Sequence, residues 1–301
     1  MTTTTLITLF TTLIAAAPHN WTVRDHMPLE KFVVQAHRGA GVLAPENTIA
    51  AFELGWKLHC VPEADVRTTS DGAIVAFHDA NFARVVVDVT PELAKKGVKD
   101  VTFEQLQKLD VGEGQHVLKM SEIFAVMTGK PERRMYLDIK QVDFEQLAKE
   151  VREAKIESQV IMASTKYDEI KKWKALVPQS QTLLWVGSTT DAGVEKKLEP
   201  VRAANYEGVT QVQIHVHLRE GIETIKRDQP NLFVESEDYL RARGDEFRQR
   251  GLLYQTLPYG KGAESPAVYW KLLDLGFMSF ATDHPDVTWD VIKKYYAEAG
   301  K

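Results

Sequence analysis

Residues 33–79 read VVQAHRGAGVLAPENTIAAFELGWKLHCVPEADVRTTSDGAIVAFHD, and they contain three short apolar runs that each end in ionisable side chains. In chain order these side chains are His37, Arg38, Glu63, Asp65 and His78. In parallel α/β proteins, reactive groups gather at the carboxyl ends of the strands. The pattern therefore predicts parallel strands with a functional site at their carboxyl edge.

Apolar runs continue to alternate with helix-like segments along the rest of the chain. The predicted strands are Phe32–Ala36, Val61–Val66, Met135–Ile139, Val160–Ala163, Thr182–Val186, Val209–His215, Leu252–Thr256 and Met278–Ala281, with a short extra strand at Ile74–His78. Their β-branched, apolar composition is typical of a parallel sheet that is covered on both faces. Eight βα units favour a closed (β/α)8 TIM barrel, a single α/β domain with a short insertion after the second strand.

Capping residues mark the starts of several helices between these strands. Asn47 is in position to cap the helix that follows the first strand. Thr102 with Gln105, and Asp143 with Gln146, have the spacing of capping boxes, in which two side chains satisfy free backbone N–H groups. These signals support a helix in each of the three connections.

The composition is that of an ordinary globular protein, with 44% hydrophobic and 26% charged residues. A net charge of −5 and the absence of a long basic run argue against nucleic acid as a partner. The single cysteine, Cys60, excludes an internal disulfide and a cysteine zinc site. Because the net charge is negative, an anionic substrate must be bound by a local group of cations.

We divide the chain into an N-terminal arm at residues 1–30 and a barrel at residues 31–301. The arm contains an apolar run at residues 6–14 followed by small residues, as in a secretory signal peptide, although its first basic residue is Arg24. This run is too short to span a bilayer, so we expect no stable membrane insertion. We expect a periplasmic or extracellular location if the arm is a signal peptide, and a cytoplasmic location otherwise.

Three carboxylates are predicted at neighbouring strand ends. Glu63 and Asp65 are two residues apart on one strand and therefore face the same way, and Asp138 lies on the next main strand. Carboxylates this close repel one another unless a cation lies between them, and an all-oxygen set suits a hard ion. We therefore expect one divalent cation, Mg²⁺ or Ca²⁺. The alternative is that each acid pairs locally with Arg67 or Lys140.

Two histidines and two cations are expected beside these acids. Imidazole exchanges protons near neutral pH, so His37 and His78 are candidates for a general acid and a general base. Their order is open from sequence, and we take His37 as the base and His78 as the acid. Arg38 offers a planar fork and Lys140 a point charge for a phosphate group.

The motifs AHRGAGVLAPENTIAAFELG, EADVRTTSDG and VAFHD, in this order, resemble those of the glycerophosphodiester phosphodiesterases. That family joins His-Arg-Gly, Pro-Glu-Asn-Thr, Glu-x-Asp with a Thr-x-Asp-Gly turn, and His-Asp. Two later segments, VKDVTFEQLQKLDVG and FMSFATDHPD, also resemble the family. The similarity extends over residues 33–285, and it is dense in the first third and thin in the middle.

The resemblance implies a (β/α)8 barrel that hydrolyses a glycerophosphodiester to an alcohol and sn-glycerol 3-phosphate. It implies a divalent cation on Glu63, Asp65 and Asp138, acid–base catalysis by His37 and His78, phosphate binding by Arg38, and bracing of the first loop by Glu46 and Asn47. The chain departs from the family at three places. Asp138 stands where a glutamate is usual, residues 253–257 replace a Trp-Thr-Val-Asn motif, and Arg84-Val85 replaces Arg-Thr. The second departure leads us to expect an altered alcohol-binding side.

Three other functions remain open at this point. A phospholipase D-like lyase would use an internal hydroxyl of the substrate as nucleophile and release a cyclic phosphate. An amidohydrolase-type metal enzyme needs His-x-His on its first strand, whereas this chain has it at His215 and His217 on the sixth. The third is a non-catalytic barrel that serves as a binding protein.

The expected partner is a small-molecule phosphodiester, and neither its alcohol moiety nor the oligomeric state is readable from the sequence. The aromatic side chains near strand ends, which could form an apolar wall around a choline or lipid-like group, are Phe82, Trp185, Tyr254 and Tyr259. His215 and His217 point the same way on the sixth strand, either into this pocket or into the packed barrel mouth.

Overall fold

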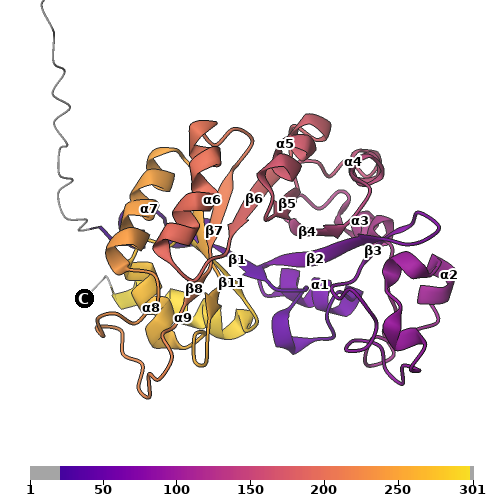
Figure 1. The fold of residues 1–301 in the computed structure, drawn as a ribbon, viewed down its shortest axis with the longest axis horizontal. Coiled ribbons are helices and arrows are strands. Elements are labelled where there is room, and N and C mark those ends of the chain that lie inside the picture. The colour runs from indigo at the N-terminus through magenta and orange to yellow at the C-terminus, as the bar shows by residue number, and fades with distance from the viewer. Residues whose placement is uncertain (1–20, 299–301) are drawn as a thin grey trace, which may run out of the picture.

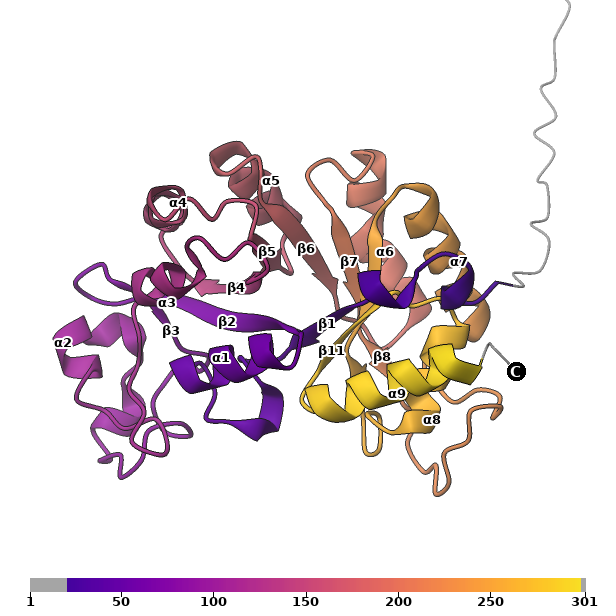
Figure 2. The same ribbon diagram turned by 180° about the vertical axis from the view of Figure 1, so that it is seen from behind.

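Eight parallel strands close into a ring in the computed structural model, which describes residues 21–298 (Figures 1 and 2). The ring strands are β1 (Val33–Ala36), β2 (Val61–Thr68), β4 (Met135–Gln141), β5 (Val160–Ser164), β6 (Gln181–Val186), β7 (Gln211–Ile214), β9 (Leu253–Thr256) and β11 (Ser279–Thr282). They follow the order β1-β11-β9-β7-β6-β5-β4-β2, and β1 also pairs with β2, which closes the ring. The predicted TIM barrel is confirmed.

The helices lie around the outside of this ring (Figure 1). They are α1 (Ile49–Lys57), α2 (Phe103–Leu106), α3 (Met120–Met127), α4 (Phe144–Glu153), α5 (Tyr167–Leu176), α6 (Asp191–Ala203), α7 (Glu237–Gln249), α8 (Pro266–Asp274) and α9 (Pro285–Glu298). Each buries an apolar face, as α4 does with Phe144, Leu147 and Val151. Within residues 21–298, no helix combines the length and apolar character needed to cross a membrane.

The start of α1 differs from the sequence-based prediction. Thr48, and not Asn47, is the N-cap, because the Thr48 hydroxyl accepts a hydrogen bond from the backbone N–H of Ala51 at 3.2 Å. Asn47 adopts a left-handed backbone conformation with a φ of 57°. Its amide side chain is thereby free to bond elsewhere, and it reaches the candidate site described below.

The two predicted capping boxes have different outcomes. Between Thr102 and Gln105 both reciprocal bonds are present, so that box is confirmed. Asp143 caps α4 by accepting hydrogen bonds from the backbone of the first turn. Gln146, however, donates to Glu150 at 2.8 Å, and it makes no return bond to the cap. The second box is therefore only half formed.

The insertion after the second barrel strand is a subdomain with its own core. It contains β3 (Ile74–Ala76), which pairs antiparallel with β2, the short helices η4 (Leu93–Lys95) and η5 (Val98–Asp100), and α2. Its apolar cluster, separate from the main core, consists of Val75, Phe77, Phe82, Val86, Val98, Val101, Phe103, Leu106, Val111 and Val117. This small core fixes the loop that carries His78.

Polar side chains fill part of the barrel interior, where aliphatic layers are usual. Gln255 donates to the hydroxyl of Ser279 at 2.8 Å and accepts from Gln213 at 2.5 Å. The hydroxyl of Tyr136 donates to Gln211 at 2.7 Å. Because buried polar groups need partners, Gln213 and Gln255 pair between the neighbouring strands β7 and β9. Tyr136 of β4 reaches across the ring to Gln211 of β7. They form a satisfied polar floor below the candidate site.

The first described residues pack against the outside of the barrel. They include the short helices η1 (Val23–Asp25) and η2 (Leu29–Lys31). Trp21 donates to Asp245 of α7 at 2.6 Å, and Tyr296 of α9 donates to the carbonyl oxygen of Met27 at 2.6 Å. The predicted signal segment falls within residues 1–20, outside the described residues, so export stays a prediction.

We predict that Gly55→Ala destabilises the protein, because Gly55 of α1 lies against the loop that carries His37. A β-carbon at position 55 would lie 2.3 Å from the carbonyl oxygen of Gly39. Such overpacking costs about 1–3 kcal/mol of unfolding free energy, more than the gain in helix propensity. Gly244 of α7 is the matched control, since its β-carbon would meet Tyr254 at an ordinary 3.4 Å. Urea unfolding that gave the two alanine variants equal stability would contradict this prediction.

Candidate active site

Three buried carboxylates lie together on β2 and β4. Glu63 and Asp65 come from β2, and Asp138 of β4 is the register partner of Asp65. Oxygen atoms of all three lie within 4.8 Å of one another. The donor set is all oxygen, and Glu63 Oε1 is buried with no hydrogen-bond partner among the described residues. The residues present therefore fit a hard divalent cation, as the sequence predicts.

The crowding of these carboxylates is visible in their pKa values. Burial, with the neighbouring charge of Asp65, raises the pKa of Glu63. Burial and the charge of Glu63 raise the pKa of Asp138 to about 8. Burial acts in the same direction on Asp65, but Lys140 and His78 outweigh it and lower its pKa. The group thus lacks the positive charge needed to keep all three acids ionised.

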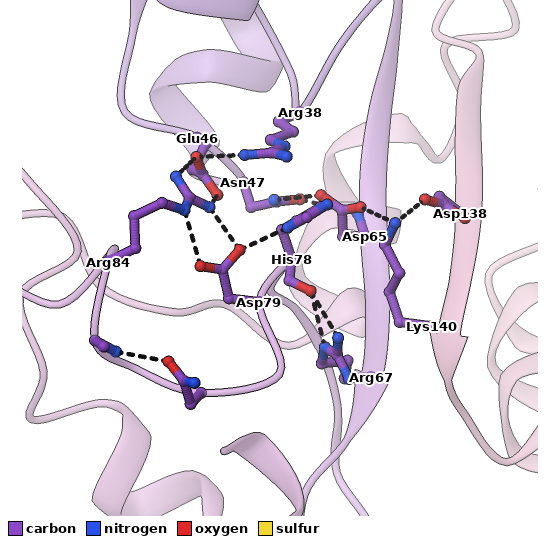
Figure 3. A network of polar contacts seen from close by, with 12 residues as sticks. Arg38, Glu46, Asn47, Asp65, Arg67, His78, Asp79, Arg84, Asp138 and Lys140 are labelled. Atoms are coloured by element: carbon purple, nitrogen blue, oxygen red, sulfur yellow. Dashed lines mark hydrogen bonds and ion pairs between the residues drawn. The ribbon is translucent and has the colours of Figure 1, made fainter. Parts of the chain in front are cut away.

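Lys140 supplies part of this positive charge. Its Nζ atom lies 3.2 Å from Asp65 Oδ1 and also forms an ion pair with Asp138 (Figure 3). The alternative of local pairing is therefore correct for Lys140 but wrong for Arg67. The guanidinium of Arg67 donates instead to the carbonyl oxygen of His78, at 3.1 and 2.7 Å. Arg67 braces the histidine loop rather than the acids.

Two amide side chains fix the orientation of the acids on β2. Asn47 donates to Asp65 Oδ2 at 2.8 Å and accepts from the backbone N–H of Asp65 at 2.9 Å. Gln35 donates to Glu63 Oε2 at 2.7 Å. Each of these two acids therefore has one oxygen bound to an amide. Of the remaining oxygens, Asp65 Oδ1 faces Lys140, and Glu63 Oε1 accepts no hydrogen bond from residues 21–298. Asn47, expected to brace the first loop, also positions a candidate metal ligand.

His37 follows β1 and is oriented by Asp283, which follows β11. Its Nδ1 atom lies 2.7 Å from Asp283 Oδ1, so Nε2 is the nitrogen available to a ligand. Burial lowers the pKa of His37, but the hydrogen bond to Asp283 and the charge of Glu63 outweigh burial and raise it to about 9. Asp283 is not among the site residues predicted from the sequence. Its place directly after the last strand was the available signal.

His78 has the same kind of partner but the opposite pKa shift. Its Nδ1 atom lies 2.6 Å from Asp79 Oδ1. Burial lowers the pKa of His78, and the charges of Asp65 and Asp79 do not fully offset this effect. At neutral pH His37 is charged and His78 is neutral. The sequence-based assignment of His37 as the base and His78 as the acid stays a prediction, and these pKa shifts favour the opposite order.

Arg84 joins the two loops that carry these histidines (Figure 3). Its guanidinium donates to both oxygens of Glu46, each at 2.7 Å, and to both oxygens of Asp79, at 2.7 and 2.8 Å. Glu46 also accepts from Arg38 at 3.0 Å, and so braces the first loop as expected. The bond from Arg84 lowers the pKa of Asp79 to about 2, which keeps Asp79 an acceptor for His78.

The four residues predicted to contact substrate line a single cavity of about 730 Å³, within the range of about 300–1,000 Å³ that is usual for small-molecule sites. They are His37, Arg38, His78 and Lys140. Trp185 and Tyr259 line the same cavity, as predicted for an aromatic wall. We call this space the catalytic cavity.

The other two aromatic candidates do not line this cavity. Phe82 is fully buried in the insertion core, where its ring lies 5.4 Å from that of Phe77. Tyr254 is fully buried in the main core, with its ring 3.9 Å from that of Phe277. The prediction is therefore wrong for both. A place near a strand end does not determine whether a side chain faces the mouth or the surrounding helices.

The imidazole rings of His215 and His217 both pack against the ring of Tyr259. Their rings lie 4.9 and 5.3 Å from the Tyr259 ring. His217 is bonded to Glu235 at 2.8 Å, and burial lowers the pKa of His215 to about 4. Among residues 21–298, the grouping that could hold a metal contains neither histidine. An amidohydrolase-type His-x-His site is therefore not formed here.

We predict that Asp283→Asn lowers the pKa of His37 in metal-free protein, because it removes the hydrogen-bonded charge. A histidine pKa raised from 6.5 to about 9 stabilises the folded state fully below pH 6.5, and this contribution disappears as the pH rises through 9. The loss of thermal stability should therefore be larger at pH 6 than at pH 9.5. NMR titration of the His37 ring and unfolding in EDTA measure both effects.

The control for this change is Asp286→Asn, since Asp286 is an exposed acid in the first turn of α9. It should leave the pKa of His37 close to its original value. An unchanged pKa in the Asp283 variant, or equal shifts in both variants, would show that Asp283 does not set the charge of His37.

Comparison with known proteins agrees with this fold and identifies the family. The profile of the glycerophosphoryl diester phosphodiesterase family matches residues 37–287. YhdW of Bacillus subtilis is 50% identical over 78 residues, which are 26% of this chain and 30% of that protein. The glycerophosphodiester phosphodiesterase of Caldanaerobacter subterraneus subsp. tengcongensis is 32% identical over 162 residues, 49% of this chain and 64% of that protein. The matches thus span less than two thirds of these relatives.

Solved structures show the same fold at lower sequence identity. The glycerophosphodiester phosphodiesterase from Agrobacterium tumefaciens has a TM-score of 0.62 at 18% identity, over 86% of this chain and 99% of that one. An Oleispira antarctica phosphodiesterase in complex with the product sn-glycerol-3-phosphate has a TM-score of 0.60 at 21% identity, over 91% and 100%. The profile match runs from His37 after the first strand to beyond Asp283 after the last. The chain therefore belongs to the glycerophosphoryl diester phosphodiesterase family.

Proposed function

We propose that this protein hydrolyses a glycerophosphodiester to an alcohol and sn-glycerol 3-phosphate with one divalent cation. The observation that carries the proposal is the catalytic cavity, where two histidines and two cations lie beside three buried carboxylates. Membership of the family supports the reaction class. The product bound to the Oleispira phosphodiesterase supports the substrate class.

The phosphate group of the substrate would lie between Arg38 and Lys140. Arg38 is held by Glu46, and its buried Nε atom has no partner within the described residues. A cation held by the three acids would polarise a phosphoryl oxygen and ease deprotonation of water. Mg²⁺ and Ca²⁺ both suit carboxylate ligands, and the short arm of Asp138 favours the smaller ion.

The protonation states of the histidines suit opposite ends of an in-line displacement. His78, neutral at pH 7, would accept a proton from the attacking water, and His37, charged at pH 7, would donate one to the leaving alkoxide. Asp79 and Asp283 hold the two imidazoles with Nδ1 facing a carboxylate, which leaves both Nε2 atoms for the reaction.

A second candidate reaction uses the same residues. If a hydroxyl of the substrate takes the place of water, the product is a cyclic phosphate, as in a phospholipase D-like lyase. The ³¹P NMR spectrum of the product separates the two reactions, because the five-membered cyclic diester and the monoester resonate at different positions. An inert protein that binds the substrate without turnover would be the non-catalytic barrel considered above.

We predict that chelation abolishes activity and that Mg²⁺ or Ca²⁺ restores it, because the candidate ligands are carboxylates alone. Asp138→Asn should weaken binding of the ion in calorimetry at least about ten-fold, since it removes a full charge from the site. The control is Asp286→Asn, which lies outside the acidic group. Full activity in EDTA, or tighter binding of zinc with zinc-dependent turnover, would contradict the assignment.

We predict that His37→Ala and His78→Ala each lower kcat at least about 100-fold, the usual contribution of a positioned acid or base. The profile of kcat against pH should be bell-shaped, with His78 setting the acidic limb and His37 the basic limb. His116→Ala is the control, because His116 is an exposed residue of the insertion. Turnover near that of the unmodified protein in either variant would remove that histidine from the mechanism.

A further inference from the structure

A second cavity, of about 1,020 Å³, adjoins the catalytic cavity. It lies between the connections that follow β7 and β9, and Tyr259, Gly260 and Gly262 line both spaces. We call it the side cavity. The short strands β8 (Val216–His217) and β10 (Pro258–Tyr259) pair in parallel. Backbone hydrogen bonds between these strands therefore fix the position of Tyr259 in the shared wall. The two cavities are therefore neighbours, and Tyr259, Gly260 and Gly262 form a common wall between them.

The connection that forms the far wall is closed at its base. Leu218 and Phe233 form an antiparallel bridge, and Phe233 is buried in the main core. Glu235, fully buried, accepts hydrogen bonds from both the backbone and the ring of His217, at 2.9 and 2.8 Å. These contacts fix both ends of the loop formed by residues 219–232. The side cavity is thus a built feature of the fold.

The chemistry of the side cavity is apolar inside and balanced in charge at its rim. Leu218, Ile222, Ile225 and Val234 supply hydrocarbon to its lining. The charged lining residues are all exposed, two of each sign: Arg219, Lys261, Glu220 and Glu223. Their charges cancel, so the rim exerts no net attraction on an ionic group. The interior therefore suits a neutral, apolar ligand.

A row of rings connects the two cavities. The ring centroids of Trp185 and His215 are 5.9 Å apart, those of His215 and Tyr259 4.9 Å, and those of Tyr259 and His217 5.3 Å. Trp185 lines the catalytic cavity, His217 lines the side cavity, and Tyr259 lines both. A hydrocarbon chain that extended from one cavity to the other would pack against this row of rings.

We propose that the side cavity binds an apolar chain of the substrate while the phosphodiester group lies at Arg38 and Lys140. This inference rests on the proposed function and narrows its substrate class to phosphodiesters that carry an extended hydrocarbon chain. Each methylene moved from water into such a space is worth roughly four-fold in affinity. The chain can be carried as an acyl group on the glycerol or as the alkyl group of the alcohol, and both present the same surface.

The test compares substrates that differ only in chain length, at concentrations below micelle formation. One series carries 1-acyl chains of two, four, six and eight carbons on glycerophosphoethanolamine, and the other carries alkyl alcohols of the same lengths on glycerol phosphate. From two to eight carbons, kcat/KM should rise at least about 50-fold in one series. Six fully buried methylenes at roughly four-fold each would give a larger rise, and the lower figure allows for incomplete burial of the chain. The series that rises identifies the group that carries the chain. A flat response in both series would overturn the inference.

The matched variant is Ile225→Asn, which places an amide in the side cavity. The ratio of kcat/KM between the eight-carbon and two-carbon substrates should fall about ten-fold, because the amide must be desolvated by the chain. This ratio is measured within one preparation, so it does not depend on the fraction of protein that folds. Val142→Asn is the control, a half-buried valine packed on the core outside both cavities. An equal fall in both variants, or none in Ile225→Asn, would count against the side cavity.

A binding measurement separates this inference from the proposed reaction. Octyl phosphate and ethyl phosphate share one anionic group, and calorimetry with either needs no turnover. Tighter binding of octyl phosphate, lost in Ile225→Asn, would support the side cavity even if no diester were cleaved. Cleavage of glycerophosphoethanolamine with equal binding of the two phosphates would support the reaction and overturn the side cavity alone.

Discussion

Mutual repulsion among three buried carboxylates is the constraint on which the site depends. Glu63, Asp65 and Asp138 lie with oxygen atoms within 4.8 Å of one another, on strands that pair in register. Burial of one unpaired charge is already costly, and three together would drive the strands apart in a less rigid scaffold. The closed ring of parallel strands keeps these strands together, so the carboxylates cannot move apart. Their repulsion therefore gives the site an affinity for positive charge. Lys140 meets part of it, and a divalent cation would meet the rest.

The same distribution of charge explains why two similar histidine pairs differ. His37 and His78 each bond to an aspartate through Nδ1, and burial lowers the pKa of both. His37 also faces the poorly neutralised Glu63, which favours the imidazolium. At His78, the positive charges of Arg38 and Lys140 act with burial to lower the pKa, and Asp65 and Asp79 do not offset them. One histidine is therefore charged and the other neutral, although their nearest partners are alike.

The sequence determined the parts of the site that depend on strand periodicity. Glu63 and Asp65 face the same way because they are two apart on a strand, and they meet Asp138 because parallel strands share an edge. Residues whose roles depend on distant partners were missed or assigned wrongly. Asn47 fits a local capping rule, yet the tertiary bond to Asp65 decides its conformation. Asp283 lies 246 positions from His37, so no local pattern could pair them.

The proposed catalytic residues and the side cavity belong to different parts of the barrel. The acids, cations and histidines belong to β1, β2, β4 and the insertion, where strand register fixes each position. The side cavity is built from connections after β7 and β9, which can change without moving that register. The departure from the family motif at residues 253–257 covers β9 and the first residue of the connection after it, Leu257, which lines the catalytic cavity. The other two departures, at Asp138 and at Arg84-Val85, lie in or beside the acidic group and the histidine loops. The acidic group nevertheless keeps three carboxylates, because Asp138 replaces one acid by another. Tyr259, two residues after Leu257, belongs to both cavities, so an altered connection can change the accepted substrate without altering the chemistry.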